Sequence, residues 1–299
     1  MSKNAILTLL TETPLHPGTG QNLGVIDLPV QRERHTDFPF VPSSSLKGAL
    51  RSGLDLNPKM KATIFGADLD SGQHFAGAVA LGDTRILAFP VRQMQGVFGW
   101  VTSPTVIDRL KRDLSIVNVD LEVGISSSVE DNTALVTTRS KQSSKVVIED
   151  LMLEAKPDSA VDTLADQLAA LCLGRNAHDM LREKFKRDLI VLSEQQFRHL
   201  LNLGTEVVAR NKLDEKKTSE NLWYMELIPR DTLFYSPIMA EDSRGGNSMK
   251  ADEILNKLSD AISAGYVQVG GNETLGHGWC ATSVHLAESL EEVLSANGE

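Results

Sequence analysis

The hydrophobic pattern at the two ends of the chain predicts buried strands and one helix. Residues 5–10 are apolar on both faces of a strand apart from Thr8, and the strand is predicted to end before Pro14 and the glycines that follow. Near the other end, helical spacing predicts a helix over 251–264, and strands are predicted at 266–271 and 279–287. The two predicted strands there are separated by a glycine-rich segment, which favours a loop between them.

The middle of the chain is predicted to be mainly helical. Ser43, Ser44 and Ser45 precede apolar residues at helical spacing, which predicts a helix capped by a serine. Further helices are predicted at 103–114, 158–173, 176–187 and 194–202, the last three as a helical insertion over about residues 155–203. Strands are predicted within 77–91, 116–125 and 145–153, with a flexible polar excursion between the last two.

Two β-rich runs after Gly204 are joined by a charged segment. This pattern predicts a long hairpin over about residues 205–230, and its tip is too polar to pack on a core of its own. Without an internal repeat or a clear linker, we interpret residues 1–299 as a single elaborated α+β domain.

Composition and charge narrow the class of protein. The hydrophobic fraction of 41% and the charged fraction of 23% are typical of a globular chain with a full core. No apolar run is long enough for a membrane span and no export signal is present, so the cytoplasm is the expected location. The two cysteines, Cys172 and Cys280, are far apart and indicate neither a zinc site nor a disulfide framework. The net charge of -10 is opposite in sign to the charge expected of a protein that binds nucleic acid on its own. Any RNA contact must therefore depend on local basic residues.

The loop between the first strand and the serine-led helix is the strongest candidate for chemistry. Asp27 is flanked by apolar residues in this loop. A carboxylate in such a position has three candidate roles, which are general base, metal ligand and cap of a turn. His16 is a candidate acid/base partner for Asp27, although a lone loop histidine is more often structural. Residue type alone does not choose between these roles.

Basic residues follow the same loop. Arg32, Arg34, Lys47 and Arg51 make this part of the chain locally positive, which favours either a phosphate track or a solvated helix face. Arg210 and Lys212 lie on the predicted hairpin.

The segment from Gly270 to Gly278 is rich in glycine. It has the GxxxxG spacing of a phosphate-binding loop, but His277 stands where that motif requires lysine. The glycines therefore indicate either close approach of the backbone to another strand or to a ribose-phosphate chain, or a tight β-turn.

Three segments, residues 13–51, 210–238 and 267–280, together resemble the RAMP superfamily of CRISPR proteins, and within it the backbone ribonuclease subunits of type III-B effectors. They occur in the family's order and reach from the first strand nearly to the C-terminus. The resemblance implies a ferredoxin-like, RRM-type core, with the hairpin as the family's thumb. It further implies that several copies stack along a guide RNA, together with other effector subunits, and that target RNA is cut at regular intervals.

The resemblance also implies roles for residues. Asp27 corresponds to the family's loop aspartate, which acts in metal-dependent attack by the adjacent ribose 2′-hydroxyl, with Mg²⁺ or Mn²⁺ as the expected ion. His16 and Glu226 are further catalytic candidates. The RNA contacts are expected to come from the basic helix, the hairpin and the glycine-rich loop, and the residues are Ser44, Ser45, Lys47, Gly48, Arg51, Arg32, Arg34, Arg210, Lys212, Gly270, Gly271, Gly276 and His277. Two alternatives stay open: a guide-binding scaffold without catalysis and a guide-processing endonuclease, which the acidic charge disfavours.

Overall fold

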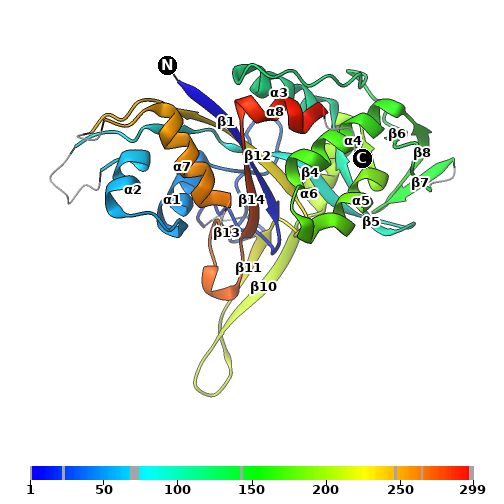
Figure 1. The fold of residues 1–299 in the computed structure, drawn as a ribbon. Helices are drawn as coiled ribbons and strands as arrows, with labels where there is room; N and C mark the ends of the chain where they lie inside the picture. Colours follow the sequence, from blue (N-terminus) through cyan, green and yellow to red (C-terminus); the bar gives the residue numbers. More distant parts are fainter. Residues whose placement is uncertain are drawn as a thin grey trace.

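The computed structural model describes residues 2–21, 24–67, 74–141, 144–245, 248–263 and 265–295 of the chain. It contains one long mixed sheet, helices packed against it, and a two-stranded ribbon that leaves the body of the molecule (Figure 1). The chain is therefore of the α+β type, as predicted.

Most strands join the long sheet, whose order along the main path is β13-β14-β1-β12-β4-β5-β9-β6-β8-β7. The strands of this sheet are β1 (Lys3–Thr11), β2 (Phe40–Val41), β3 (Val79–Leu81), β4 (Thr84–Gln93), β5 (Val97–Thr102), β6 (Thr133–Val136), β7 (Lys145–Ile148), β8 (Leu151–Pro157), β9 (Leu189–Val191), β12 (Leu233–Ala240), β13 (Tyr266–Gln268) and β14 (Trp279–Leu286).

The helices and short 3₁₀ turns are distributed along the whole chain. They are α1 (Ser43–Gly53), α2 (Pro58–Phe65), α3 (Pro104–Ile116), α4 (Ser159–Cys172), η2 (Asn176–His178), α5 (Asp179–Asp188), α6 (Glu194–Leu203), α7 (Ala251–Ser263), η3 (Glu273–Leu275) and α8 (Ala287–Ser295).

The first strand is the centre of the structure. β1 pairs antiparallel with β12 on one side and with β14 on the other, and β12 pairs antiparallel with β4. Because both faces of β1 are covered, its residues from Ala5 to Thr11 are all buried. Helices α4, α7 and α8 pack on β1 and β14. The ends of β1 and β14 therefore provide a rigid base for the loops that follow β1 and precede β14.

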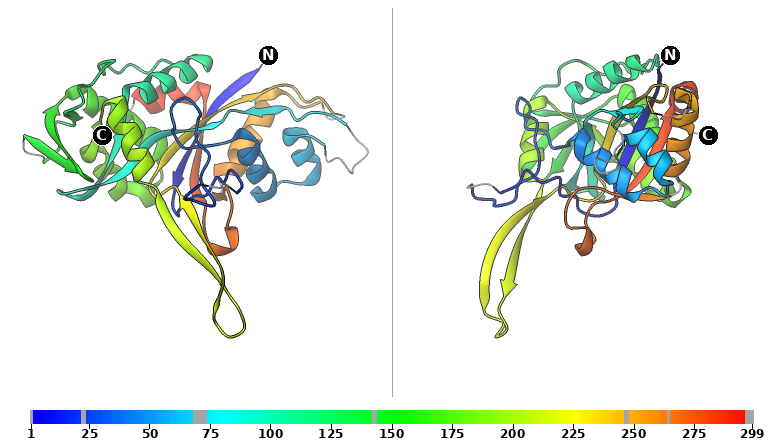
Figure 2. Two further views of the ribbon diagram at one scale, coloured as in Figure 1. Left: turned by 180° about the vertical axis from the view of Figure 1, so that it is seen from behind. Right: turned by 90° about the vertical axis from the view of Figure 1, so that its left-hand side faces the viewer.

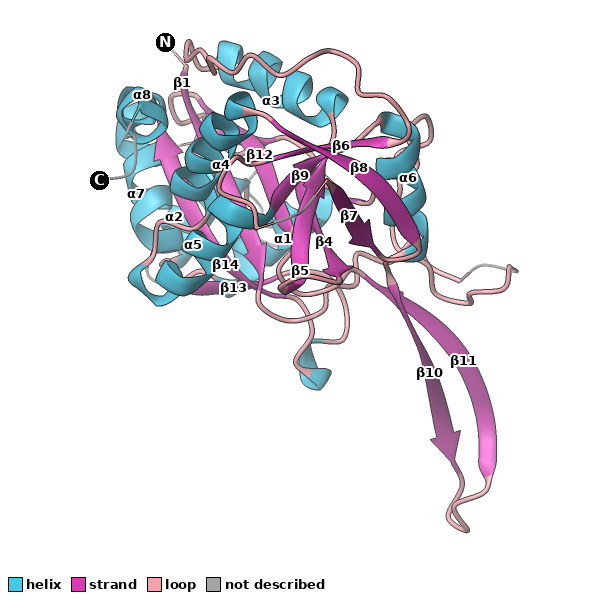
Figure 3. Ribbon diagram, turned by 90° about the vertical axis from the view of Figure 1, so that its right-hand side faces the viewer, coloured by secondary structure: helices cyan, strands magenta, loops and turns pink. Residues whose placement is uncertain are grey.

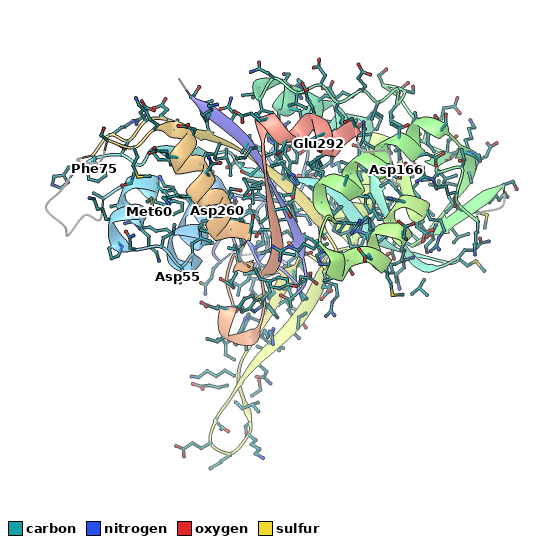
Figure 4. All side chains as sticks on the ribbon, in the orientation of Figure 1. Asp55, Met60, Phe75, Asp166, Asp260 and Glu292 are labelled. Atoms are coloured by element: carbon teal, nitrogen blue, oxygen red, sulfur yellow. The ribbon has the colours of Figure 1, made fainter. Side chains whose placement is uncertain are left out.

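The remaining two strands form the hairpin. β10 (Glu206–Leu213) and β11 (Ser219–Leu227) pair antiparallel in a sheet of their own. Figures 2 and 3 show this ribbon extending away from the molecule, and Figure 4 shows side chains standing out along its length. Isolated two-stranded ribbons are only marginally stable, so the base of the hairpin needs support from the body.

Several sequence-based element predictions are confirmed, and three are wrong. The predicted strand over 116–125 is irregular backbone: Val119, Leu121 and Val123 are buried alternately, but the segment pairs with no described strand. The predicted polar excursion before residue 145 contains β6, which pairs with β8 and β9. No serine side chain caps α1, because the N-cap is Pro42 and the Ser43 amide donates to Asp83 Oδ1 instead, at 2.8 Å.

Two further expectations concern the chain as a whole. Within the part of the chain that the structure describes, no helix has both the length and the hydrophobicity needed to cross a bilayer. The division into a single domain with a helical insertion stays a prediction, although the three helices predicted for the insertion correspond to α4, α5 and α6.

Candidate functional site

The loop after β1 forms the outer edge of the hairpin base. Leu15 and Ile228 exchange two backbone hydrogen bonds of 2.8 Å, and Leu28 forms an isolated parallel bridge with Met225. The Leu28 amide donates to the Tyr224 carbonyl at 3.1 Å, and the Glu226 amide donates back to the Leu28 carbonyl at 3.0 Å. An edge strand exposes unpaired amides and carbonyls, and here a loop from the other end of the sequence pairs with them. Residues far apart in sequence are thereby fixed next to each other.

Asp27 is held by this same edge. The Tyr224 amide donates to Asp27 Oδ2 at 2.7 Å, and the aspartate is half-buried. Asp27 lines a cleft of about 600 Å³ together with residues of β11 and Asn272 of the glycine-rich segment. The cleft thus joins the three parts of the chain that the sequence singled out.

His16 lies beneath the glycine-rich segment, with 7% of its surface exposed. Its Nδ1 is 2.8 Å from the Glu226 carbonyl oxygen. A carbonyl only accepts hydrogen bonds, so Nδ1 carries the proton and Nε2 keeps its lone pair in the neutral ring. A Cβ on Gly18 would lie 2.7 Å from His16 Nε2, so a side chain at position 18 would crowd this nitrogen. The arrangement makes His16 a possible proton acceptor.

Glu226, the third predicted catalytic residue, is buried and fully engaged. Its Oε1 accepts from Arg32 Nη2 at 2.6 Å and from Thr205 Oγ1 at 2.8 Å, and its Oε2 accepts from the Val30 amide at 3.0 Å. Burial opposes ionisation, but the Val30 and Arg32 hydrogen bonds outweigh it and hold the pKa of Glu226 below its usual value. An ionised carboxylate with these partners has no proton to donate, and its geometry favours a positioning role over a catalytic one.

Arg32 is likewise bound within the protein. Its guanidinium donates to the Asp37 and Leu201 carbonyls and to Asn202 Oδ1 as well as to Glu226. The prediction that Arg32 contacts RNA is not tested, but these four acceptors leave it little donor capacity.

The glycine-rich segment follows β13 and packs over His16. The Gly271 amide donates to the His16 carbonyl at 3.0 Å, and Gly270 has a φ of 80°. A Cβ at Gly270 would lie 2.5 Å from the His16 carbonyl oxygen, so this position requires glycine. Gly276 also has a positive φ, of 76°, but its missing Cβ would meet no atom within 4 Å. At Gly270 the backbone thus approaches another backbone segment closely, whereas no described atom lies close to the corresponding position at Gly276.

Arg210 and His277 meet where the hairpin passes this segment. Arg210 Nη2 lies 3.4 Å from His277 Nε2, while Arg210 Nε and His277 Nδ1 are buried without a hydrogen-bond partner among the described residues. Burial, followed by the positive charge of Arg210, lowers the pKa of His277 below its usual value. Burying two polar atoms without partners costs free energy, so this junction between the hairpin and the glycine-rich segment is unusual for a protein interior.

The other predicted RNA contacts lie on α1, on the loop and along the hairpin. Ser44, Gly48 and Arg34 are exposed, while Ser45 and Lys47 are half-buried. Arg51 donates to the Gly66 carbonyl at 2.7 Å and so helps hold α1 against the end of α2. Lys212 forms an exposed ion pair with Glu220, at 2.8 Å. Helix α1 packs against β13, which brings its basic residues to the same side of the molecule as the start of the glycine-rich segment.

The donor set at Asp27 limits what kind of metal site is possible. No group of three or more His, Cys, Asp or Glu side chains among the described residues could hold a metal ion. One oxygen of Asp27 already accepts an amide hydrogen bond. The residues therefore fit only a weakly held Mg²⁺ or Mn²⁺ ion that takes Asp27 as one ligand and water and substrate oxygens as the others.

A comparison with protein families places this geometry in context. The family model described as "RAMP superfamily" matches residues 8–281, a range that includes the loop, the hairpin and the glycine-rich segment. The chain belongs to the RAMP superfamily.

Full-length relatives within the superfamily have similar sequences. A protein of Pyrococcus furiosus named CRISPR system Cmr endoribonuclease Cmr4 is 39% identical, with 99% of this chain and 98% of the relative covered. The CRISPR system CMR subunit Cmr4 of Saccharolobus solfataricus is 26% identical, with 89% and 91% covered.

Solved structures agree with this assignment. A crystal structure of oligomeric Cmr4 from Pyrococcus furiosus superposes with a TM-score of 0.72 at 31% identity, covering 95% of this chain and 98% of that one. A chain of the type III-B Cmr-beta complex bound to cognate target RNA, 20% identical, shares the fold with a TM-score of 0.70 over 97% of this chain and 98% of that one.

Some residues of the Asp27 cleft could not be predicted from the sequence. The Tyr224 amide that holds Asp27 has no side-chain signature, and nothing in the sequence singles out the amide side chains of the cleft residues Gln21, Asn221 and Asn272. Only their shared cleft, formed by folding, brings them together.

Proposed function

We propose that this protein is the backbone subunit of a type III-B CRISPR effector, which binds guide RNA and cleaves the complementary target RNA. The full-length relationship to a Cmr4 endoribonuclease supports this, and the observation that carries it is the position of Asp27. The carboxylate lies in a cleft between the loop, the hairpin and the glycine-rich segment, where a strand of RNA can reach it.

The finer description of the fold belongs to the same proposal. In chain order, β1, α1, β4, β12, α7 and β14 follow the βαββαβ pattern, and their sheet order is β14-β1-β12-β4 with antiparallel neighbours. This order supports the interpretation of a ferredoxin-like, RRM-type core. The projecting ribbon β10–β11 then serves as the thumb, which separates guide and target so that one target linkage is presented at Asp27.

The proposed reaction is an intramolecular transesterification. The ribose 2′-oxygen forms a bond to the adjacent phosphorus as the bond from phosphorus to the 5′-oxygen breaks, leaving a 2′,3′-cyclic phosphate and a 5′-hydroxyl. The 2′-hydroxyl proton passes to Asp27 or to His16 Nε2, and the departing 5′-oxygen takes a proton from water. Since the nucleophile is part of the substrate, the protein supplies mainly in-line geometry and a proton acceptor.

Charge neutralisation at the phosphate is the remaining requirement. A divalent ion bound at Asp27 would supply it by polarising a phosphate oxygen. The rest is performed by this chain: the Tyr224 amide fixes the carboxylate, and Arg210 lies at the hairpin junction as a cation for the RNA backbone.

The expected partners are guide RNA, target RNA, further copies of this chain and other type III-B subunits. Oligomeric Cmr4 of Pyrococcus furiosus supports the self-association. The acidic net charge of -10 fits a subunit whose basic groove is built by an assembly, because charges act over roughly 8 Å at physiological salt. A cytoplasmic location stays a prediction.

Cleavage of labelled complementary RNA by the reconstituted effector tests the proposal, with Mg²⁺ or Mn²⁺ present. We expect regularly spaced fragments from the wild type and a rate about 10²- to 10⁴-fold lower with Asp27→Asn, which keeps the acceptor for Tyr224 but loses the charge. Asp37→Asn, on the same loop but outside the cleft, is the matched control and should cleave normally. Without metal, cleavage should be lost. If Asp27→Asn and Asp37→Asn cleaved at the same rate, Asp27 would not be the catalytic residue. If the wild type bound RNA without cutting it, this chain would be a scaffold subunit.

A further inference from the structure

The lining of the Asp27 cleft is chemically distinct from a phosphate site. Apart from Asp27, the residues that line it are Gln21, Asn221 and Asn272, which carry amide side chains, together with Trp223, Leu28 and Leu222. None of the described residues that line it is lysine or arginine. Asp27 is the one charged residue among these, so the part of the lining away from Asp27 suits an uncharged group.

The hairpin places cations beside the lining residues of β11. Side chains two apart lie on the same face of a strand, so Asn221 and Trp223 project from one face of β11. Trp223 is paired with Arg210 on β10, and Asn221 is paired with Lys212. One face of the hairpin therefore carries two cations along β10, and the indole and amide of β11 beside them.

We propose that the cleft is a nucleobase site, which takes the base of the target nucleotide whose 2′-hydroxyl lies at Asp27. This inference rests on the proposed function and extends it. The base stacks on Trp223, its edge meets the amides of Asn221, Asn272 and Gln21, and the RNA backbone runs towards Arg210. At about 600 Å³ the cleft has the size of a small-molecule pocket.

The lining also suits a nuclease whose targets are chosen by a guide. Such an enzyme must accept any base at the scissile position. An indole stacks on every base, because every base has a π-face. Asn and Gln amides carry both donors and acceptors, so they pair with different base edges without demanding one. The site gains binding energy at the reacting nucleotide while remaining tolerant of sequence.

A double-mutant cycle tests the contact between Trp223 and the base. The reconstituted effector is given target RNA with its normal base, or with an abasic ribose that keeps the 2′-hydroxyl, on the 5′ side of one scissile bond. For the wild type we expect the abasic site to be cut about tenfold to a hundredfold more slowly than the intact one, with the other sites unchanged. Trp223→Ala should slow cleavage of the intact target by a similar factor and have little further effect at the abasic site. Cleavage rates of targets with the four natural bases at this position should differ from one another by less than any of them differs from the rate of the abasic target.

Tyr224→Ala is the matched control, because its side chain lies on the opposite face of β11 while its amide still holds Asp27. Its effect should be the same on intact and abasic targets. Two results would overturn the base site while leaving the proposed function intact. The first is that the wild type cuts the abasic target as fast as the intact one. The second is that the rate reductions caused by Trp223→Ala and by removal of the base multiply. If the wild type cuts no target at all, the proposed function itself fails.

Discussion

The Arg32 guanidinium and the Glu226 carboxylate form a 2.6 Å ion pair with the side chain of Arg32 20% and that of Glu226 5% exposed. Arg32 lies on the loop that carries Asp27, and Glu226 lies on β11, two residues after the amide that binds Asp27. Glu226 also holds the Val30 amide and, through its carbonyl, the His16 ring. One residue of the hairpin therefore fixes the loop on both sides of the candidate catalytic aspartate.

Glu226→Gln should reduce the cleavage rate while leaving affinity for target RNA nearly unchanged. The substitution keeps the shape of the side chain but weakens the contacts to Arg32 and Val30, so Asp27 is held less firmly. We expect about a tenfold lower single-turnover rate, since misplacement of about 1 Å costs up to 10²-fold. Faster hydrogen exchange at the Val30 and Tyr224 amides should accompany it.

Glu220→Gln is the control for this experiment, because it removes an exposed ion pair on the same hairpin. It should change neither the rate nor the exchange. If Glu226→Gln lowered RNA affinity as strongly as the rate, Glu226 would support the whole hairpin rather than Asp27.

The same ion pair predicts a pH dependence of stability. Because the pKa of Glu226 in the folded chain is below its usual value, ionised Glu226 stabilises the fold above the ordinary glutamate pKa, about 4.3. This contribution is lost as the pH falls through the lower folded-state pKa. Wild type should therefore exceed Glu226→Gln in unfolding free energy by roughly 2 kcal/mol at pH 7, and the difference should shrink below about pH 4. Urea unfolding of both chains at several pH values measures it; a difference that is constant with pH would show that charge is not its source.

The sequence located the parts of this site but not their assembly. Asp27, the hairpin and the glycine-rich segment were recognisable from motif and composition, because each has local signals such as prolines, alternation or glycines. The pairing of the Asp27 loop with β11 joins residues about 200 positions apart, and local propensity holds no information about it.

Similar reasons explain the errors in secondary structure. Residues 119–123 alternate as a strand does, but they bury their apolar side chains without a neighbouring strand to pair with. β6 was missed because its polar flanks concealed a short strand that is stabilised only by its neighbours β8 and β9. The roles predicted for Glu226 in catalysis and for Arg32 in RNA binding stay predictions, and the burial and ion pair of the two side chains, which no local pattern indicates, favour a positioning role.

Lys47→Ala should weaken retention of guide RNA and reduce its salt dependence. Lys47 is half-buried on α1, and no hydrogen bond or ion pair joins it to another described residue, so its ammonium is available to a phosphate. Losing one phosphate contact should lower the slope of log K against log salt by about 0.7. Guide affinity measured at several salt concentrations gives this slope. Lys59→Ala, on the neighbouring helix α2, is the control. If it reduced the salt slope as much as Lys47→Ala does, the effect would come from the general electrostatic field of this surface rather than from a phosphate contact by Lys47.

Gly270→Ala should destabilise the chain far more than Gly276→Ala. Both glycines have φ near 80°, which costs an L-residue about 1 to 2 kcal/mol. At Gly276 this strain is the main penalty, because no atom of the described residues lies within 4 Å of the added methyl group. At Gly270 the methyl group would press on the His16 carbonyl, which is backbone and accepts the Gly271 amide, so the loop must move away from His16. Thermal unfolding of the two full-length variants measures the difference, and cleavage by the assembled effector should fall with Gly270→Ala alone. If the two variants had equal melting temperatures, the glycine-rich segment would be able to move away from His16 without loss of stability. Its contact with His16 would then not hold the site together.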